Sequence, residues 1–222
     1  MLSCEKLNDM IVDLLTADGS WIVPYLETLS DWCTARGDRS RMYTNHKEVR
    51  GGDVLFILGY LKIIPKKYRD LYGKALVIHE SDLPSGRGFA PMSWQISEGA
   101  QEIVFTLFEA DDGVDTGPIY FKKTLLLSGT ELFPEWRKKQ GELTIRMAKR
   151  FLQSYGEVKP SQQEGDGSYF EKRSSKDDEM LVTMTLAECF DRIRVCDPER
   201  YPAWFQYRGR KFKVLVEPLS EE

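Results

Sequence analysis

Two residues that lie far apart in the chain could together move protons: His79 and Asp115. His79 ends the apolar segment that begins at Ala75 and opens a loop that runs to Pro91, and Asp115 follows 36 residues later (115 − 79 = 36) in a turn rich in carboxylates and glycine. A carboxylate beside an imidazole holds the ring in one tautomer and raises its basicity, which suits general acid–base chemistry near neutral pH. The same residues also fit a histidine that only caps a strand, and a turn that is solvated or binds a cation.

The other histidine and the cysteines offer few alternative residues for chemistry of this kind. The chain has two histidines, and the second, His46, stands in a basic, weakly patterned region, where we expect it at the surface or at the rim of a site. The four cysteines (Cys4, Cys33, Cys189 and Cys196) are scattered and form no CxxC pair, so the sequence predicts neither a metal site nor a disulfide framework.

Composition and charge exclude several classes of protein. The 222 residues carry 31 Lys and Arg against 35 Asp and Glu, a net charge of 31 − 35 = −4, which argues against a nucleic-acid partner bound through a strongly basic surface. The longest apolar stretch, Val54 to Leu61, is far shorter than the ~20 residues of a membrane span, so no membrane partner is expected. The N-terminus, with Glu5 and Asp9, shows no signal peptide, and the cytoplasm is the default compartment.

The elements that must position these side chains alternate along the first part of the chain. Strands are predicted at 10–16, 41–44, 53–59, 75–79, 103–108 and 119–127, and helices at 24–37, 66–72, 91–98 and 134–155. This alternation predicts an α/β fold, a Rossmann-like, mostly parallel sheet with helices on both faces. Chemistry in such sheets gathers beyond the carboxyl ends of strands, which places loops 18–21, 59–65, 79–88 and 111–117 at one working edge. No GxGxxG motif follows the first strand, so a generic dinucleotide-binding domain is disfavoured.

Three parts of the chain differ in pattern. Residues 1–156 form the domain that carries the candidate site, 157–179 is a polar loop or linker, and 180–222 is a C-terminal appendage. The appendage contains a short helix near Leu186 and a small β-hairpin, with strands 204–208 and 211–216 that turn at Gly209. The hairpin either covers the core or forms a homodimer interface, because an open strand edge is costly to leave unpaired.

Two segments resemble a known family. They read His79-x-Ser-x-Leu-Pro-x-x-Arg-Gly-x-x-Pro91-x-x-Trp94-x-Ile-x-x-Gly99 and Val114-Asp115-Thr-Gly-Pro-Ile119. This pattern resembles the signature of the 10-formyltetrahydrofolate-dependent formyltransferases, a family that includes methionyl-tRNA, glycinamide ribonucleotide and sugar N-formyltransferases. The similarity covers roughly residues 50–127, and the residues in these segments are most similar to those of the sugar N-formyltransferase branch.

The resemblance implies a formyltransferase catalytic domain over residues 1–156 that takes 10-formyltetrahydrofolate as co-substrate. The implied acceptor is the primary amine of a nucleotide-linked amino sugar of the 4-amino-4,6-dideoxy type, and the implied partners are therefore a sugar nucleotide and folate. An aminoacyl-tRNA or a carrier-bound aminoacyl group is the alternative acceptor. A tRNA substrate favours a separate basic domain, whereas only 222 − 156 = 66 residues follow the first domain. A folate-binding scaffold without catalysis is the alternative from another class.

The resemblance also implies the residues of the site. His79 and Asp115 match the catalytic pair. One wall of the folate pocket matches Tyr60, Leu61, Lys62, Ile63 and Ile64, and the backbone that bonds the pterin ring matches Ala110, Asp111, Asp112, Gly113 and Val114. The acceptor site matches Ser81, Pro84, Gly86, Arg87 and Gly88. Basic side chains that could meet a diphosphate are Lys62, Lys66 and Arg87.

One position departs from the family pattern. The family usually has asparagine two residues before the histidine, where this chain has Val77. In the family that amide helps to hold the formyl oxygen as it becomes negative, and the loss of one such donor costs about 3 kcal/mol of transition-state stabilisation. Either another donor replaces it, or the enzyme is slow, or it is inactive; the candidate donors are protonated His79, Ser81, Gln95 and a backbone N–H.

Overall fold

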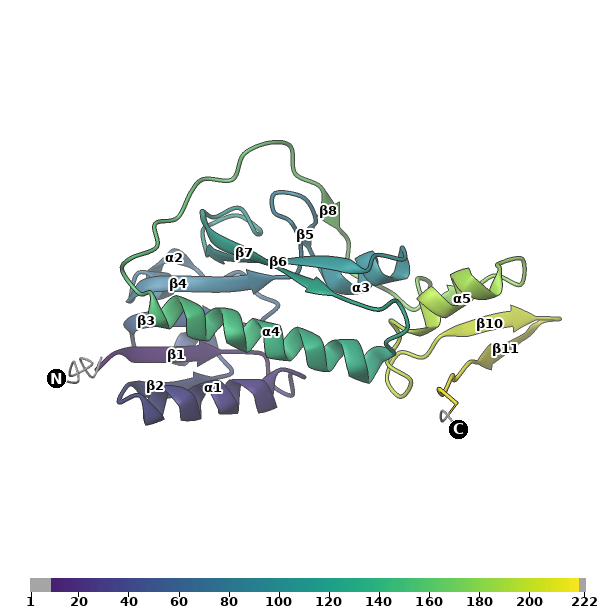
Figure 1. The fold of residues 1–222 in the computed structure, drawn as a ribbon, viewed down its shortest axis with the longest axis horizontal. Coiled ribbons are helices and arrows are strands. Elements are labelled where there is room, and N and C mark those ends of the chain that lie inside the picture. Colours follow the sequence, from purple (N-terminus) through teal and green to yellow (C-terminus); the bar gives the residue numbers. More distant parts are fainter. Residues whose placement is uncertain (1–8, 220–222) are drawn as a thin grey trace.

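The computed structural model describes residues 9–219, which form a six-stranded sheet flanked by helices and a small C-terminal part (Figure 1). The strand order is β2-β1-β3-β4-β6-β7. Four neighbouring strands are parallel: β1 (Ile11–Leu15), β2 (Arg39–Tyr43), β3 (Gly52–Ile57) and β4 (Tyr72–His79). The predicted α/β fold is confirmed. The predicted N-terminal features, with Cys4 and Glu5, lie outside the described residues.

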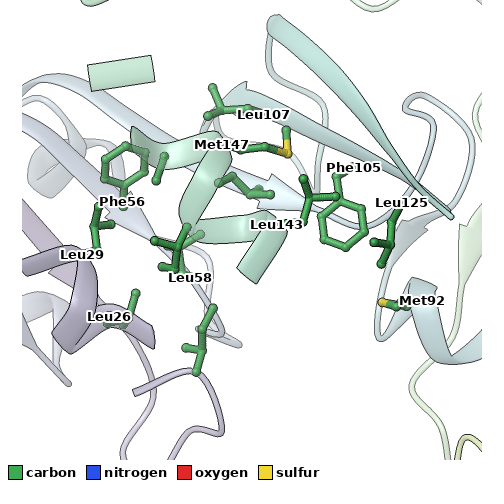
Figure 2. Close-up of a cluster of buried hydrophobic side chains, with 14 of the residues drawn as sticks. Leu26, Leu29, Phe56, Leu58, Met92, Phe105, Leu107, Leu125, Leu143 and Met147 are labelled. Carbon is green, nitrogen blue, oxygen red and sulfur yellow. The ribbon is translucent and has the colours of Figure 1, made fainter. Parts of the chain in front are cut away.

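The face of the sheet that packs against the long helices forms the main core. In β3, Val54 and Phe56 point to this face and Leu55 and Ile57 to the other, as the two-residue period of a strand requires. This face is covered by α1 (Val23–Ala35) and α4 (Phe133–Gln153). Figure 2 shows Leu143 and Met147 of α4 among side chains of α1 and of the sheet. Each such buried side chain contributes about 1.5–3 kcal/mol.

The opposite face has a thinner cover. Its cluster of buried residues includes Leu55, Ile57 and Tyr72, and it is covered by the short η1 (His46–Glu48) and α2 (Lys66–Arg69) and by the loop that contains Ile64. A helix of four residues hides little of a sheet. This face therefore leaves room for a cavity above the strands.

The strand that leads to Asp115 runs against its neighbour. β6 (Glu102–Glu109) pairs antiparallel with β4, so that Leu76 faces Glu109 and His79 faces Thr106, and β7 (Ile119–Leu126) pairs antiparallel with β6. The end of β6 therefore lies beside Ala75, whose carbonyl accepts from Ala110 N–H (2.8 Å). The expectation that loop 111–117 leaves the same edge as the loop after His79 is wrong. The loop leaves β6 beside Ala75, four residues before His79 in β4, and then brings Asp115 to within 3.7 Å of His79.

The segment predicted as a polar linker packs against the first domain. It carries β8 (Tyr169–Phe170), which pairs parallel with β5 (Arg87–Gly88), and Ser161 forms an isolated bridge with Ile119. In Figure 1 the chain arches from the end of α4 over the sheet to β8. We call residues 161–170 the strap.

The C-terminal part forms a small sheet beside a helix. The predicted hairpin is present as β10 (Trp204–Tyr207) and β11 (Arg210–Lys213), and β9 (Glu179–Met180) adds a parallel third strand. α5 (Leu186–Ile193) lies next to it, and α3 (Pro91–Ser97) completes the helices. The three described cysteines are free thiols. Within residues 9–219, no helix combines the length and apolarity needed to traverse a bilayer.

A buried carboxylate joins the C-terminal part to the start of α4. Glu131 accepts from Ser128 N–H (2.7 Å) and from Lys139 Nζ (2.6 Å) through Oε1, and from Arg194 Nη2 (3.2 Å) through Oε2. Arg194 also donates from Nε to the Glu131 carbonyl (3.0 Å), and its side chain is 1% exposed. Burial opposes the charge of Glu131, but the bonds from Lys139 and Ser128 outweigh burial and lower the pKa to about 2.

We expect Glu131→Gln to destabilise the protein by about 3 kcal/mol at pH 7, from the lowering of this pKa from 4.5 to about 2. The folded state binds fewer protons than the unfolded state, so this stabilisation is present above about pH 4.5 and is lost as the pH falls towards 2. Urea unfolding of both proteins from pH 7 downwards measures the difference. The exposed Glu142→Gln on the same helix is the control. A difference that does not shrink with acidification contradicts the assignment.

Candidate functional site

A cavity of about 530 Å³ lies at the carboxyl ends of β3 and β4 and over the adjoining sheet face. The cavity is lined by residues of the four loops that the sequence placed at the working edge (18–21, 59–65, 79–88 and 111–117), and also by residues of α4 and the strap. The lining comprises residues 21–22, 57–64, 77–80, 88–91, 108, 110–111, 113–115, 137, 140, 144 and 169. This size suits a small-molecule ligand.

His79 and Asp115 meet at this cavity. Their nearest atoms, His79 Nε2 and Asp115 Oδ2, are 3.7 Å apart, and the two side chains are 8% and 16% exposed. His79 Nε2 lies 2.8 Å from the carbonyl of Gly86. Because a carbonyl can only accept, Nε2 donates the proton of this bond, and in the neutral ring Nδ1 carries the lone pair. The imidazole is therefore fixed in one tautomer with a carboxylate close to its N–H.

The loop that holds His79 also holds Asp115. Asp115 Oδ2 accepts from Gly88 N–H (2.8 Å), and the backbone of Asp115 is left-handed, with φ 53°. Gly88 has φ 100°, and a Cβ there would lie 2.4 Å from the Phe170 carbonyl oxygen. Only glycine combines this conformation with so close an approach. Residues 86–88 are thus the part of the chain that brings imidazole and carboxylate together.

The strap fixes these loops from outside. Ser168 Oγ accepts from Gly86 N–H (2.8 Å), and the Gln163 amide nitrogen donates to the carbonyls of Asp115 and Gly117 (2.8 Å each). Gln163 Oε1 in turn accepts from Arg87 Nη2 (2.7 Å). One amide thereby links the loop after β4 to the loop after β6. The sequence gives little indication that the strap holds these loops, because the strap is polar and its strand has two residues.

The two loops expected to hold a flat ring are also tied together. Arg69 donates from Nε to the carbonyl of Ile64 (3.0 Å) and from Nη1 to the carbonyl of Ala110 (2.7 Å). Its Nη2 forms an ion pair with Asp112. The guanidinium therefore ties segment 59–64 to segment 110–114, and residues of both segments line the cavity.

A polar stripe of α4 forms a further wall that the sequence analysis did not identify. Arg137, Gln140 and Thr144 stand at spacings of three and four on a helix face that otherwise faces the core, and all three line the cavity. Gln140 Nε2 donates to Glu80 Oε1 (2.5 Å), and Arg137 Nη1 donates to Gln140 Oε1 (2.6 Å). Burial lowers the pKa of Arg137 to about 10. The sequence could have indicated this wall, because these three polar residues interrupt the apolar side of the predicted helix.

The predicted residues divide between the cavity and its supports. Those that line it are His79 and Asp115, with Tyr60, Leu61, Lys62, Ile63, Ile64, Ala110, Asp111, Gly113, Val114 and Gly88. Those outside the lining are Asp112, Ser81, Pro84, Gly86 and Arg87. Asp112 turns to Arg69 and Arg87 to Gln163, so both act on neighbouring loops. Lys66 pairs with Asp70 (2.6 Å) and also lies outside.

Val77 lines the same cavity as His79 and Asp115. Of the expected replacement donors, Gln95 is committed elsewhere, since its Nε2 donates to the carbonyls of Glu80 (2.7 Å) and Pro91 (3.1 Å). Ser81 Oγ is buried without a partner and outside the lining. His46 is outside the lining, and its Nδ1 is 2.8 Å from the hydroxyl of Tyr60, which lines the cavity. His79 and backbone N–H groups are the expected donors that remain at the cavity.

Comparison with known sequences gives a consistent result. A family model described as formyl transferase matches residues 21–136. The methionyl-tRNA formyltransferase of Myxococcus xanthus is 32% identical over 163 residues, 72% of this chain and 52% of that protein. The methionyl-tRNA formyltransferase of Kosmotoga olearia is 29% identical over 66% of this chain and 49% of its own length. The chain thus spans about half the length of the curated relatives it matches.

Solved structures share the fold. A methionyl-tRNA formyltransferase from Clostridium thermocellum has a TM-score of 0.80 at 22% identity, covering 95% of this chain and 94% of that one. A likely sugar N-formyltransferase from Mycobacterium tuberculosis has 0.73 at 16% identity, covering 96% and 99%. HypX from Aquifex aeolicus in complex with tetrahydrofolic acid has 0.73 at 16% identity, covering 91% and 37%.

We expect Gln163→Ala to loosen both loops at the cavity, because it removes the two bonds to the carbonyls of Asp115 and Gly117 and the one from Arg87. Hydrogen–deuterium exchange measures this as faster exchange in residues 84–89 and 113–117, with little change in β3. The exposed neighbour Gln162→Ala is the control. Equal exchange in both variants would show that the strap does not hold the site.

Proposed function

This chain belongs to the formyl transferase family, and from that premise we propose that it transfers a formyl group from 10-formyltetrahydrofolate to the primary amine of a nucleotide-linked amino sugar. The observation that carries the proposal is the pair His79 and Asp115, 3.7 Å apart at the edge of a cavity of about 530 Å³. A fixed imidazole beside a carboxylate, open to a ligand-sized space, is equipped for proton transfer during acyl transfer.

The folate side of the cavity is supported by its walls. Val77 and Phe108 form an apolar floor, and Leu61 and Ile63, 71% and 57% exposed, stand at the mouth. Apolar walls of this kind suit a planar ring, whose polar edge would meet the backbone of segment 110–114. The related fold of HypX, which binds tetrahydrofolic acid, supports the same choice of co-substrate.

The mechanism follows from the ring's fixed tautomer. The uncharged amine attacks the formyl carbon, a C–N bond forms, and the carbonyl oxygen becomes negative. His79 Nδ1 accepts the proton of the new ammonium and returns it to folate N10 as the bond from N10 to the formyl carbon breaks. Asp115, 3.7 Å from Nε2, stabilises the transient imidazolium. Every bond and proton is accounted for within substrate, co-substrate and His79.

The amino-sugar acceptor is favoured over a tRNA by the charge of the chain. The net charge is −4, which gives a polyanionic RNA little attraction. Structures of sugar N-formyltransferases match this chain over 99% of their length, and the methionyl-tRNA formyltransferase from Clostridium thermocellum matches over 94% of its own, so the shared fold is compatible with either acceptor. The methionyl-tRNA formyltransferases among the sequence relatives keep an aminoacyl acceptor as the alternative.

The C-terminal hairpin supports a homodimer as part of the proposal. β11 forms one edge of its small sheet, and Tyr207, Phe212 and Leu215 around it are 50%, 37% and 61% exposed. An open strand edge with apolar side chains favours pairing with a second copy.

We expect His79→Ala and Asp115→Asn each to lower the rate of formyl transfer by about a hundredfold or more, because each removes proton transfer or the charge that supports it. The measurement is spectrophotometric release of tetrahydrofolate with a panel of nucleotide-linked 4-amino sugars. The exposed Asp31→Asn on α1 is the matched control. Near-normal turnover in either site variant would refute the catalytic assignment.

The same assay separates the alternatives. Turnover only with an amino sugar supports the proposal. Turnover only with methionyl-tRNA would show that the acceptor is an aminoacyl-tRNA and refute the amino-sugar assignment. Binding of 5-formyltetrahydrofolate without turnover on any amine identifies a folate-binding scaffold.

A further inference from the structure

A hydrogen-bonded chain of three side chains crosses the cavity wall from the catalytic loop to α4. Glu80, the neighbour of His79, accepts from Gln140, and Gln140 accepts from Arg137. A carboxylate can only accept and a guanidinium can only donate, so the two ends fix which way the amide of Gln140 points. Its oxygen is turned towards Arg137 and its nitrogen towards Glu80.

Arg137 is a partly buried cation, and the carboxylates that favour its charge, Glu80 and Asp197, act on it without forming an ion pair. Its guanidinium carbon lies 4.5 Å, 5.0 Å and 4.3 Å from the ring centroids of Trp21, Phe133 and Trp136. Its Nε is buried without a hydrogen-bond partner, and no carboxylate of residues 9–219 lies within ion-pair distance of the guanidinium. Burial lowers its pKa to about 10, which leaves it charged at neutral pH. Buried charges are usually paired, because desolvation costs several kcal/mol.

The surroundings of Arg137 point to a ligand as the missing partner. The guanidinium lines the cavity that holds His79 and Asp115, and Thr144, two turns further along α4, also lines it with a buried hydroxyl that has no partner. Two unsatisfied donors on one wall match an acceptor-rich anion. Trp21 beside them offers a flat face to a base or sugar ring.

We propose that Arg137 is the anion subsite of the acceptor, which binds the diphosphate of a nucleoside-diphosphate sugar, and that Glu80 and Gln140 position it. This inference rests on the proposed function. It concerns the diphosphate of the acceptor, which lies away from the reacting amine. Of the three basic residues suggested by the sequence, Lys66 and Arg87 are bonded elsewhere and lie outside the cavity lining, whereas the exposed Lys62 lines the cavity together with Arg137.

The test is direct binding to the full chain by isothermal titration calorimetry, with dTDP, UDP and GDP as probes and the matching nucleosides alongside. We expect at least one diphosphate to bind more tightly than its nucleoside. Arg137→Met should weaken that binding about tenfold or more, whereas the exposed Arg146→Met on the same helix should not. Equal diphosphate affinity in wild type and Arg137→Met would overturn the proposal.

A second variant tests the role of charge without removing the arginine. Gln140→Glu places a carboxylate at 2.6 Å from Arg137, which should neutralise the subsite and weaken diphosphate binding as strongly as Arg137→Met. Gln140→Met, which adds no charge, should weaken it less. Equal losses in the two Gln140 variants would contradict an electrostatic role. These variants keep Arg137, so the test holds even where Arg137→Met fails to fold.

Parallel titration with 5-formyltetrahydrofolate keeps the two hypotheses apart. Wild type that binds the folate but no diphosphate refutes the anion subsite and leaves the proposed formyl transfer standing. Wild type that binds a diphosphate through Arg137 but no folate supports the subsite as an anion site and refutes the proposed co-substrate.

Discussion

The hydrogen bond from Gly88 N–H to the Asp115 carboxylate is the contact on which the site depends. It joins two loops that leave different strands, and two residues earlier in the same loop the Gly86 carbonyl fixes the imidazole of His79. Both contacts use backbone groups, so their geometry is set by the path of the chain. A rigid path holds the two groups in place before any ligand arrives, and such preorganisation supplies much of the rate in acyl transfer.

That path is maintained from outside the cavity. The strap adds a strand to β5 and places Gln163 across both loops, while Arg69 joins the walls formed by segments 59–64 and 110–114. Both residues make two or more bonds to main-chain carbonyls. A side chain that satisfies several carbonyls at once can hold loops that have little apolar surface of their own. The thinly covered face of the sheet can therefore stay open for a ligand.

α4 serves the core and the cavity with different parts of one surface. Leu143 and Met147 fill the space between sheet and α1, as Figure 2 shows, whereas Arg137 and Gln140 stand at the cavity. A buried polar group reduces the stability of the fold unless it forms hydrogen bonds. The Nε atom of Arg137 has no hydrogen-bond partner among the described residues, so its burial is not offset. Unsatisfied polar atoms in the lining of a cavity, here on Arg137 and Thr144, are typical of a binding site.

The sequence by itself determined the strands of the main sheet and the long helices, the α/β class, and His79 and Asp115 as candidate residues. Apolar runs such as Val54–Ile57 and the spacing of Leu143, Met147 and Phe151 follow from local periodicity, and the family pattern supplied the pair. Only the tertiary structure decided the direction of β6, the place of the strap and the polar wall of α4. Strand direction and the docking of a two-residue strand depend on hydrogen bonds between distant segments, which leave no local period. Arg137 became a candidate only when the structure placed it in the cavity lining with an Nε that has no hydrogen-bond partner.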